Sequence, residues 1–339
     1  MTDKSRNTKR IAAVILMFVF FIAGNKLSNM VLEKRAAEAE NEYPMSRDVY
    51  LLDTYCTLTV YEGGGADALA AAVDALNAYD DSMNYSKEGS DIYNINHRSS
   101  DRVAVSPDTA EMLKLARDFC EETDGVLEPA IRPVTELWDF KNDKKVPDAD
   151  LIEEALTKVR SLAWDVEGDE FVAYDEDVRI DVGSIAKGFI ADKVKNVMKE
   201  SGVTSGIINL GGNVLCIGER PDGTPFSVAV RDPEKEDGYS VALELNDTSA
   251  VTAGAYERCF IEDGVRYHHI IDPKTGYSAR TGLESVTIVG PVSAVCDGLS
   301  TSLFIMGEEQ GQEFLDEYNN RHNTDYTAYF LEEGKTEQN

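Results

Sequence analysis

From Val49 onward, short β-rich segments alternate with amphipathic helical segments, and no Pro/Gly/Ser-rich linker, internal repeat or low-complexity tract separates them. Hairpin-like strands with helices gathered between them predict an α+β fold rather than a doubly wound parallel sheet. The apolar fraction of 42% is sufficient for a packed core. We therefore expect one continuous domain over residues 49–332, built of mixed or antiparallel sheets flanked by helices, with a polar tail over residues 333–339.

Periodicity and end signals place the individual elements. Residues 50–61 alternate and are rich in β-formers, which predicts a single strand. Residues 106–108 (Ser-Pro-Asp) are start signals for a helix that runs towards Thr123 and stops near Gly125. Further helices are predicted over 67–79, 148–160, 185–201, 293–306 and 310–318. Further strands are predicted over 171–174, 178–181, 241–245, 259–261, 267–271, 285–289 and 326–331, with three more between 205 and 231.

The N-terminus carries the clearest topological signal. The first ten residues hold four basic and one acidic side chain, a net charge of +3 (4 − 1), and fourteen uncharged apolar residues follow over 11–24. A basic stretch before an apolar run keeps the N-terminus cytoplasmic and directs the rest of the chain outwards. We expect residues 1–32 to form a signal or membrane anchor and residues 33–48 a stalk, with the domain at the cell membrane on the extracytoplasmic side. An uncleaved anchor is favoured over a signal cleaved near residues 37–39 or a buried core helix.

Charge and cysteine usage exclude several classes of protein. The formal net charge of −29 argues against nucleic acid as a partner, because phosphate backbones require Lys and Arg. An acidic protein that handles a phosphorylated ligand must neutralise that ligand locally, most simply with a metal ion. The five cysteines are widely separated and odd in number, which predicts neither a disulfide framework nor a zinc site.

Two glycine-containing turns are suited to a phosphorylated ligand. Residues 181–188 (DVGSIAKG) join a strand end to a helix, whose free N–H groups and positive dipole end attract anions, and Lys187 adds a positive charge. Residues 209–213 (NLGGN) follow a hydrophobic strand, and paired glycines allow a ligand to approach the backbone closely. Taken alone, each segment fits an ordinary turn equally well.

A histidine pair and a helix start provide the other candidate side chains. His268 and His269 are adjacent in a chain with only four histidines. Neighbouring strand residues point to opposite faces, so only one imidazole can face a given cleft. Asp297 and Thr301 are four apart at the start of a predicted helix and share one face. A carboxylate plus a hydroxyl is an oxygen-ligand set suited to Mg²⁺, although each pattern alone also fits a structural role.

Together, these four segments resemble in order and spacing the ApbE family, the FAD:protein FMN transferases. The resemblance runs from Leu52 to Leu315 and includes residues 123–125 and the Arg132-Pro133 pair. It implies a single α+β, T-fold-like domain that transfers FMN from FAD to a threonine or serine hydroxyl and releases AMP, with Mg²⁺ as cofactor. It also implies an acceptor that is a flavoprotein subunit of a membrane redox complex or an exported flavoprotein.

The resemblance also assigns roles to matching positions. It places catalysis on His269 and metal ligation on Asp297, Thr301 and the carbonyls of Ser184 and Ser300. It assigns FAD contacts to Leu52, Tyr85, Val126, Leu127, Glu128, Asp181, Lys187, Asn209, Gly211, Gly212 and Ile271. The chain departs from the pattern at 52–54 (Leu-Asp-Thr, where many relatives have Met-Gly-Thr), at Glu128 (where Asp is usual) and at Ala253 (where Thr-Ser-Gly is common before Tyr256).

These roles are chemically consistent with one another. An acceptor hydroxyl is a poor nucleophile at neutral pH and profits from a positioned base, for which an imidazole has the right range. Two alternatives remain open: a hydrolase, in which water replaces the acceptor and FAD yields FMN and AMP, and an anchored flavin-binding protein without chemistry. The presence of His269 with Asp297 and Thr301 disfavours the binding protein. The sequence does not separate transferase from hydrolase.

Overall fold

Seven strands form the main sheet, in the order β1 (Met45–Leu51), β2 (Thr54–Glu62), β6 (Ser205–Leu210), β7 (Asn213–Ile217), β10 (Ser249–Gly254), β13 (Leu283–Gly290) and β14 (Thr327–Glu332). The neighbours from β2 to β14 are antiparallel.

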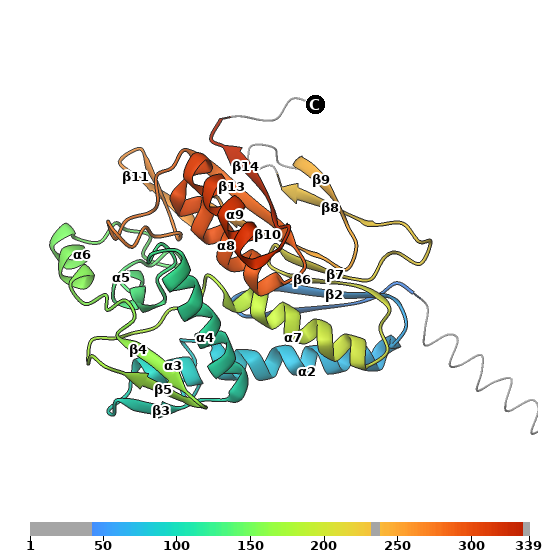
Figure 1. Cartoon of the computed structure of the whole chain (residues 1–339), viewed down its shortest axis with the longest axis horizontal. Helices are drawn as coiled ribbons and strands as arrows, with labels where there is room; N and C mark the ends of the chain where they lie inside the picture. Colours follow the sequence, from blue (N-terminus) through green and yellow to red (C-terminus); the bar gives the residue numbers. More distant parts are fainter. Residues whose placement is uncertain (1–42, 232–237, 335–339) are drawn as a thin grey trace, which may run out of the picture. The chain divides into compact units, whose positions relative to one another are not determined.

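This computed structural model describes residues 43–231 and 238–334 (Figure 1). The predicted anchor, most of the predicted stalk and nearly all of the tail lie outside the described residues. Contacts divide the chain into Met1–Met45 and Ser46–Asn339, and the description below concerns the second unit. Among the described residues, no helix is both long and apolar enough to cross a membrane.

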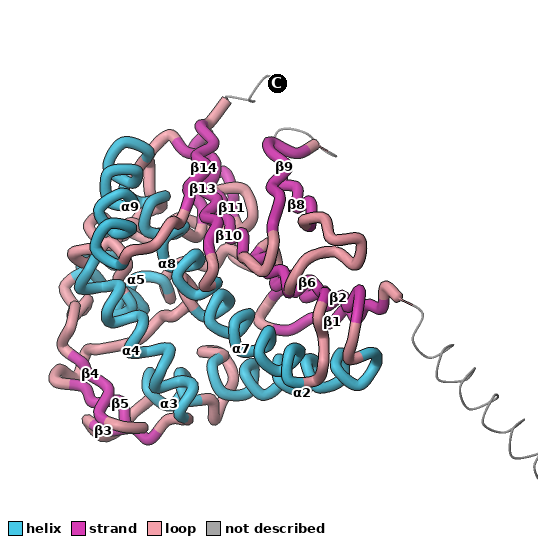
Figure 2. The backbone as a smooth tube through the Cα atoms, turned by 45° about the vertical axis from the view of Figure 1, so that its right-hand side comes forward, coloured by secondary structure: helices cyan, strands magenta, loops and turns pink. Residues whose placement is uncertain are grey.

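Helices α2 (Gly65–Met83), α7 (Ala186–Glu200) and α8 (Ser293–Met306) form a layer on one face of this sheet (Figure 2). The alternation of β2 explains the contact, because Cys56, Leu58 and Val60 all point to this side and are fully buried. Helix α9 (Glu308–His322) packs on α8 and β14. The predicted α+β architecture is confirmed.

The opposite face of the sheet is partly covered by the hairpin of β8 (Phe226–Arg231) and β9 (Tyr239–Leu245). Its apolar side packs on sheet residues of β7 and β10, including Cys216 and Ala250. The sheet therefore has helices on one side and a short β-hairpin on the other.

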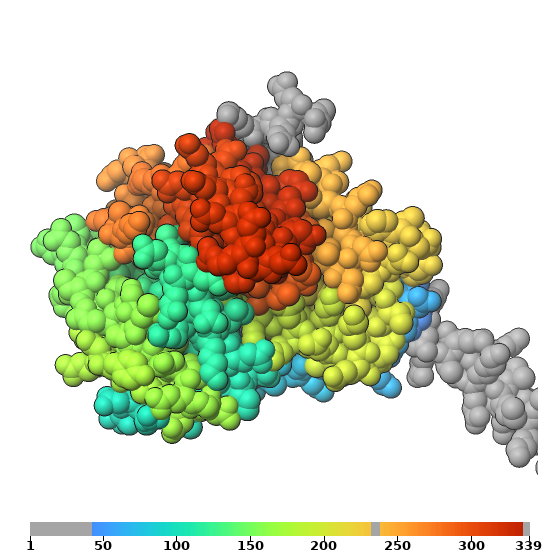
Figure 3. Space-filling view, in the orientation of Figure 1, coloured from blue at the N-terminus to red at the C-terminus, as the bar shows by residue number. Residues whose placement is uncertain are grey.

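The remaining elements contribute a second group of helices and a small sheet. Helix α4 (Pro107–Glu122) packs against α8 so closely that a Cβ at Gly298 would lie 3.0 Å from the Phe119 ring. His322 of α9 also contacts Glu122 of α4 at 2.9 Å, and the two regions adjoin in Figure 3. The other elements are α3 (Asp91–Asn96), β3 (Arg102–Ala104), η1 (Pro129–Ile131), α5 (Arg132–Thr135), α6 (Ala149–Leu156), β4 (Trp164–Glu167), β5 (Glu170–Ala173), β11 (Cys259–Glu262) and β12 (Val265–His268).

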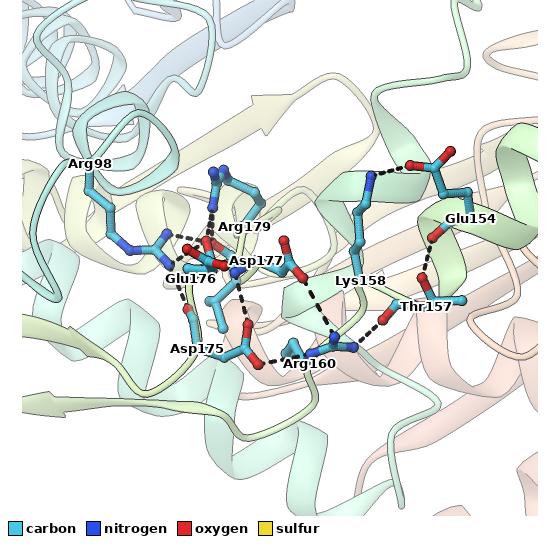
Figure 4. Close-up of polar contacts among 10 residues, drawn as sticks. Arg98, Glu154, Thr157, Lys158, Arg160, Asp175, Glu176, Asp177 and Arg179 are labelled. Atoms are coloured by element: carbon cyan, nitrogen blue, oxygen red, sulfur yellow. Dashed lines mark hydrogen bonds and ion pairs between the residues drawn. The ribbon is translucent and has the colours of Figure 1, made fainter.

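The strand predicted over 178–181 is wrong. Side chains occupy backbone groups that a strand partner would use, because Arg98 donates to the carbonyl of Val178. Arg98 also donates to the carbonyls of Asp175 and Glu176 just before the segment (Figure 4). The Asn96 side chain bonds both the N–H and the C=O of Ile180, at 2.6 and 2.8 Å. The segment is therefore held as an extended but unpaired run that leads directly into the first glycine turn.

The single strand predicted over 50–61 is also wrong. The chain turns back at Leu52 and Asp53, whose φ angles of 54° and 59° lie in the left-handed region, and so forms the β1–β2 hairpin. The sequence predicts none of the strands β3, β4 and β10. Strand β12 ends at His268 rather than at residue 271, and α6 ends at Leu156 rather than at residue 160. The helix predicted over 293–306 is confirmed residue for residue as α8.

Candidate functional site

The turn at 181–188 is built around Asp181. Its N–H donates to the carbonyl of Pro129 at 2.7 Å, which fixes the turn against η1. Its carboxylate accepts hydrogen bonds from the Gly183 N–H at 3.0 Å and from the Thr135 hydroxyl at 2.7 Å. The carboxylate is thereby held near the start of α7, where the predicted FAD contact Lys187 lies in the first turn of the helix.

Arg132 connects two of the predicted FAD contacts. Its guanidinium lies 4.2 Å from the centre of the Tyr85 ring and 3.9 Å from the Asp181 carboxylate. A cation over an aromatic face fixes the ring orientation and keeps positive charge nearby. The Arg132-Pro133 pair belongs to the family resemblance, yet no site role was assigned to Arg132. Only the fold brings it between residues 85 and 181.

Asp297 is the buried carboxylate of the site, with 4% of its surface exposed. One carboxylate oxygen accepts the N–H of Gly188 at 2.8 Å, and the other lies 3.8 Å from the Lys187 ammonium. Burial raises the pKa of Asp297, and Lys187 opposes that rise. A Cβ at Gly188 would lie 2.3 Å from the Ser293 carbonyl, so only glycine permits this approach of α7 to α8.

The other predicted metal ligands lie around this carboxylate in the fold. In a regular helix the Gly188 N–H would donate to the Ser184 carbonyl, four residues earlier, but here it donates to Asp297. The Ser184 carbonyl therefore accepts no backbone hydrogen bond from the described residues. Thr301 follows Asp297 by one turn of α8 and is half-buried. The Ser300 hydroxyl donates to the Asp297 carbonyl at 2.9 Å, and the ligand predicted from Ser300 is its own carbonyl.

This donor set fits Mg²⁺. Within residues 43–231 and 238–334, no three His, Cys, Asp or Glu side chains converge as a metal cluster. The predicted set instead combines the Asp297 carboxylate with hydroxyl and carbonyl oxygens, the ligands that Mg²⁺ prefers when substrate phosphates complete its coordination. The unused Ser184 carbonyl and the Asp297 oxygen that accepts no N–H are the observations that support the fit.

The second glycine turn, 209–213, is held between the β1–β2 hairpin and α8. Gly211 has a φ of +63°, and a Cβ there would lie 2.0 Å from the Thr54 hydroxyl. The Asn209 side chain accepts the N–H of Gly212 at 3.0 Å. The buried Asn213 amide oxygen accepts the Ser293 hydroxyl at 2.9 Å, so this last residue of the turn ties it to the start of α8.

His268 has a structural environment. It is buried, its ring Nε2 lies 3.0 Å from the Ala279 carbonyl, and its Nδ1 accepts the Ile270 N–H at 3.3 Å. The edge of the His268 ring packs on the Phe304 ring, and the two ring centres are 5.4 Å apart. Burial lowers the pKa of His268 to about 4. Both ring nitrogens are thus used by the protein interior.

His269 differs in that its Nδ1 is buried and has no hydrogen-bond partner among the described residues. Its backbone N–H donates to the Arg258 carbonyl at 3.1 Å. Burial, followed by the charges of Arg258 and Lys187, lowers the pKa of His269 to about 3. The imidazole is therefore neutral at physiological pH, the form that can accept a proton. The prediction that the two histidines differ in environment agrees with this geometry, and catalysis by His269 stays a prediction.

Five predicted FAD contacts lie in the interior or in a turn. The Glu128 carboxylate accepts the Ala130 N–H at 2.8 Å and the Ser161 hydroxyl, and burial raises its pKa. Its side chain is thus already engaged in capping η1. Leu127 is buried, and Ile271 packs in the cluster around Trp138. Val126 and Leu52 lie in turns, at the end of α4 and in the β1–β2 hairpin. Their FAD contacts stay predictions.

Sequence reasoning did not assign Glu257 and Arg258 to the site. A Cβ on Gly212 would lie 3.3 Å from the Glu257 carboxylate. Partial desolvation raises the pKa of Glu257, while the nearby charges of Lys187 and Arg258 lower it. The only signal in the sequence was their place in the 256–258 segment of the family pattern.

The fold and site together define a class of protein: an α+β protein whose antiparallel sheet and helix starts gather a buried carboxylate, a lysine and a neutral imidazole for a phosphorylated ligand. The chain belongs to the ApbE family, whose sequence model matches residues 52–327. It is 32% identical over 296 residues to an FAD:protein FMN transferase of Treponema pallidum, covering 80% of this chain and 82% of that protein. It is 33% identical over 251 residues to one of Klebsiella pneumoniae, covering 72% and 78%.

Solved structures have the same fold. The crystal structure of the ApbE protein of Thermotoga maritima superposes with a TM-score of 0.77 at 29% identity, covering 85% of this chain and 94% of that one. The flavin transferase ApbE of Vibrio cholerae superposes with a TM-score of 0.74 at 23% identity, covering 85% and 96%.

Proposed function

We propose that this protein transfers FMN from FAD to a threonine or serine hydroxyl of an acceptor protein, with Mg²⁺ as cofactor. The observation that carries the proposal is the convergence of the Asp297 carboxylate with Lys187 and the Gly188 N–H, in a member of the ApbE family that also retains a neutral His269. The curated relatives named above are FAD:protein FMN transferases and align over most of their length.

The proposed step balances without an additional reactant. The acceptor oxygen forms a bond to the FMN-side phosphorus of FAD, the P–O bond to the AMP portion breaks, and AMP departs with the electron pair. The hydroxyl proton passes to the free ring nitrogen of His269, which is neutral before the step. Lys187 provides positive charge beside the phosphates.

Asp297, Thr301 and the carbonyls of Ser184 and Ser300 would hold the metal. When bound there, Mg²⁺ supplies charge neutralisation for phosphoryl oxygens and the leaving group. The chain's own contribution is an oriented carboxylate, because the Gly188 N–H holds Asp297 at the contact of α7 and α8.

The acceptor and the location belong to the same proposal. We place the catalytic domain on the extracytoplasmic side of the cell membrane, anchored by residues 1–32, because a net charge of +3 precedes the apolar run. The acceptor is then a flavoprotein subunit of a membrane redox complex or an exported flavoprotein.

The test mixes the purified protein, FAD, Mg²⁺ and a candidate acceptor. Transfer gives in-gel flavin fluorescence at the acceptor band and a mass gain equal to one FMN moiety. Release of free FMN and AMP at the same rate with and without acceptor, and no labelled acceptor, identifies a hydrolase instead. FAD binding with no AMP release identifies a flavin-binding protein and overturns the proposal.

A further inference from the structure

The register of the β11–β12 hairpin places Arg258 beside His269. Cys259 pairs with His268, and Phe260 pairs with Tyr267. One step beyond the last pair, Arg258 stands opposite His269, and its carbonyl accepts the His269 N–H at 3.1 Å. The two residues are thus joined by a backbone hydrogen bond at the base of the hairpin, and the charge of Arg258 acts on the His269 imidazole.

The Arg258 guanidinium also reaches the β1–β2 hairpin. It donates to the Asp53 carbonyl at 3.2 Å. Leu52 and Asp53 both have positive φ, which is unfavourable for residues with a side chain, so this turn needs outside support. The Asp80 carboxylate accepts the Leu52 N–H at 3.1 Å, and Lys141 pairs with the Asp53 carboxylate at 2.7 Å. Arg258 is the support that joins this turn to the histidine.

The Arg258 charge acts on the neighbouring Glu257 carboxylate and opposes the rise in its pKa that burial causes, but the two groups do not form an ion pair. Among residues 43–231 and 238–334, no Asp or Glu forms an ion pair with Arg258. The charged or titratable groups that act on His269 are Arg258, Lys187 of α7 and the adjacent His268, and all three favour the uncharged imidazole. A like charge directly across a strand pair opposes protonation of its neighbour.

We propose that Arg258 is a positioning residue for the transfer step: it holds His269 in register at the base of the hairpin and ties it to the Leu52–Asp53 turn. The proposal rests on the proposed function and deepens it. It predicts that Arg258 affects the general base His269 and not the affinity of the protein for FAD. A residue that only bound the phosphates of FAD would change FAD affinity and leave the behaviour of His269 unaltered.

The test compares Arg258→Gln and Arg258→Lys with Arg280→Gln in the full-length protein. Arg280 is a matched control, because it is an exposed arginine 5.5 Å from the Tyr267 ring and is not among the charges that act on His269. The first readout is the ¹H–¹⁵N signature of His269 between pH 4 and 8, assigned with His269→Gln, without FAD or acceptor. The second readout is kcat at saturating FAD as a function of pH, beside the Kd of FAD. Circular dichroism and Tm establish that each variant is folded.

We expect Arg258→Gln to raise the pKa of His269 by about one unit, so that at pH 4 the protonated fraction rises from roughly a tenth to roughly half. Near pH 7 the imidazole is neutral in both proteins, so any loss of kcat there reports the position of His269. We expect kcat to fall about tenfold or more as His269 loses its fixed place, with FAD affinity changed less than kcat. Arg258→Lys should restore the His269 titration, and Arg280→Gln should match wild type in every readout.

Two results would overturn the inference. One is a His269 titration in Arg258→Gln that is identical to wild type. The other is a rise in the Kd of FAD with kcat unchanged at saturation, which would make Arg258 a phosphate ligand. Because the titration needs no substrate, it tests Arg258 even if the wild-type protein transfers no FMN, and that separate failure would refute only the proposed function.

Discussion

At the residue scale, two adjacent histidines have opposite environments. His268 uses both ring nitrogens within the core, whereas the Nδ1 of His269 is buried without a partner. We expect His269→Ala to retain FAD and Mg²⁺ binding and to lose transfer by about 10²–10⁴-fold, the usual range for removing a general base. His268→Ala should lower stability but leave kcat at saturating FAD within a few fold of wild type.

Initial rates at saturating FAD, read from acceptor fluorescence, decide between the two. An inactive His268→Ala beside a near wild-type His269→Ala would reverse the assignment. If both variants stay active, neither histidine is the base, and substrate positioning must account for the rate.

Asp297 has two functions that substitution can separate. Its carboxylate accepts the Gly188 N–H, and in the proposal it also ligates Mg²⁺. Asp297→Asn keeps an acceptor for that N–H but removes the charge, so we expect a folded protein without transfer. Asp297→Ala should also lose about 1–3 kcal/mol of stability, because the buried N–H loses its partner. Thr301→Ala should retain activity at raised Mg²⁺ and need a higher concentration for half-maximal rate.

Activity titrated against Mg²⁺, together with thermal unfolding, checks these expectations. Full transfer by Asp297→Asn in EDTA would refute the metal role of this carboxylate. A Thr301→Ala variant with an unaltered Mg²⁺ requirement would remove Thr301 from the ligand set.

His268 also predicts a pH dependence of stability. Its pKa is lowered to about 4 from an ordinary value near 6.5, so between these two pH values the unfolded chain binds a proton that the folded protein does not. Stability contributed by the neutral ring is complete above pH 6.5 and is lost as the pH falls towards 4, by up to about 3 kcal/mol.

The measurement is urea unfolding at several pH values for wild type and His268→Gln. The variant should lose stability less steeply over this range, because its side chain does not titrate. Parallel curves for the two proteins would show that protonation of His268 is not coupled to unfolding.

At the scale of elements, α7 and α8 cap each other. The Asp192 carboxylate of α7 accepts the N–H groups of Ser293 and Ala294 at 3.0 and 2.9 Å, at the start of α8. In return, Asp297 of α8 accepts the Gly188 N–H in the first turn of α7. Neither helix has a side-chain cap at its own N-cap residue. Each helix instead provides a carboxylate that accepts free N–H groups at the start of the other. The metal site we propose therefore lies at this contact between the first turns of α7 and α8.

The glycine turn at 209–213 gives a prediction with an internal control. Gly211 and Gly264 both have positive φ, +63° and +77°, but only at Gly211 would a Cβ meet another atom, the Thr54 hydroxyl. Alanine at either position should cost about 1 kcal/mol in backbone strain. Gly211→Ala should cost a further 1–3 kcal/mol from overpacking. It should also weaken FAD binding, because the β1–β2 hairpin is displaced.

Thermal unfolding and FAD titration of both variants test this prediction. Equal loss of stability in the two would mean that Thr54 moves aside freely and that the contact does not set the turn. Unchanged FAD affinity in a destabilised Gly211→Ala would separate the turn from the binding site.

At the scale of the whole molecule, the main prediction concerns the side of the membrane on which the domain lies. If residues 1–32 anchor an exported domain, deletion of residues 1–31 should give a soluble protein with unchanged kcat. In intact, wall-stripped cells, added protease should cleave the domain from Tyr43 onward. Protection of the domain until the cells are lysed would refute the extracytoplasmic location.

The strongly acidic composition is balanced locally at the site. Lys187 and Arg132 lie near Asp297 and Asp181 in a chain with a net charge of −29. These two basic side chains at the proposed binding region can neutralise phosphate charge that the surface as a whole would repel. The sequence predicts this role for the metal and for Lys187. Arg132 shares it because the fold brings it beside Asp181.

The sequence by itself determined the α+β class, the family and the local elements whose signals are contiguous. Helix α4 begins and ends with its own cap residues, Ser106 and Thr123, because capping is a local interaction. The two glycine turns were likewise evident, since φ and close approach restrict the residue type at single positions. The side chains expected at the site came from the resemblance to the ApbE family, residue by residue at matching positions.

The tertiary structure alone determines how these elements and side chains are placed relative to one another. Asn96 replaces a strand partner for Ile180 across 84 residues, so no local pattern distinguishes that segment from a strand. Arg258 faces His269 only because the intervening hairpin folds in one register, and a shift of one residue would turn its side chain to the other face. The neutral state of His269 depends on burial and on charges from distant segments. Such properties arise from long-range packing, which residue identity constrains but does not specify.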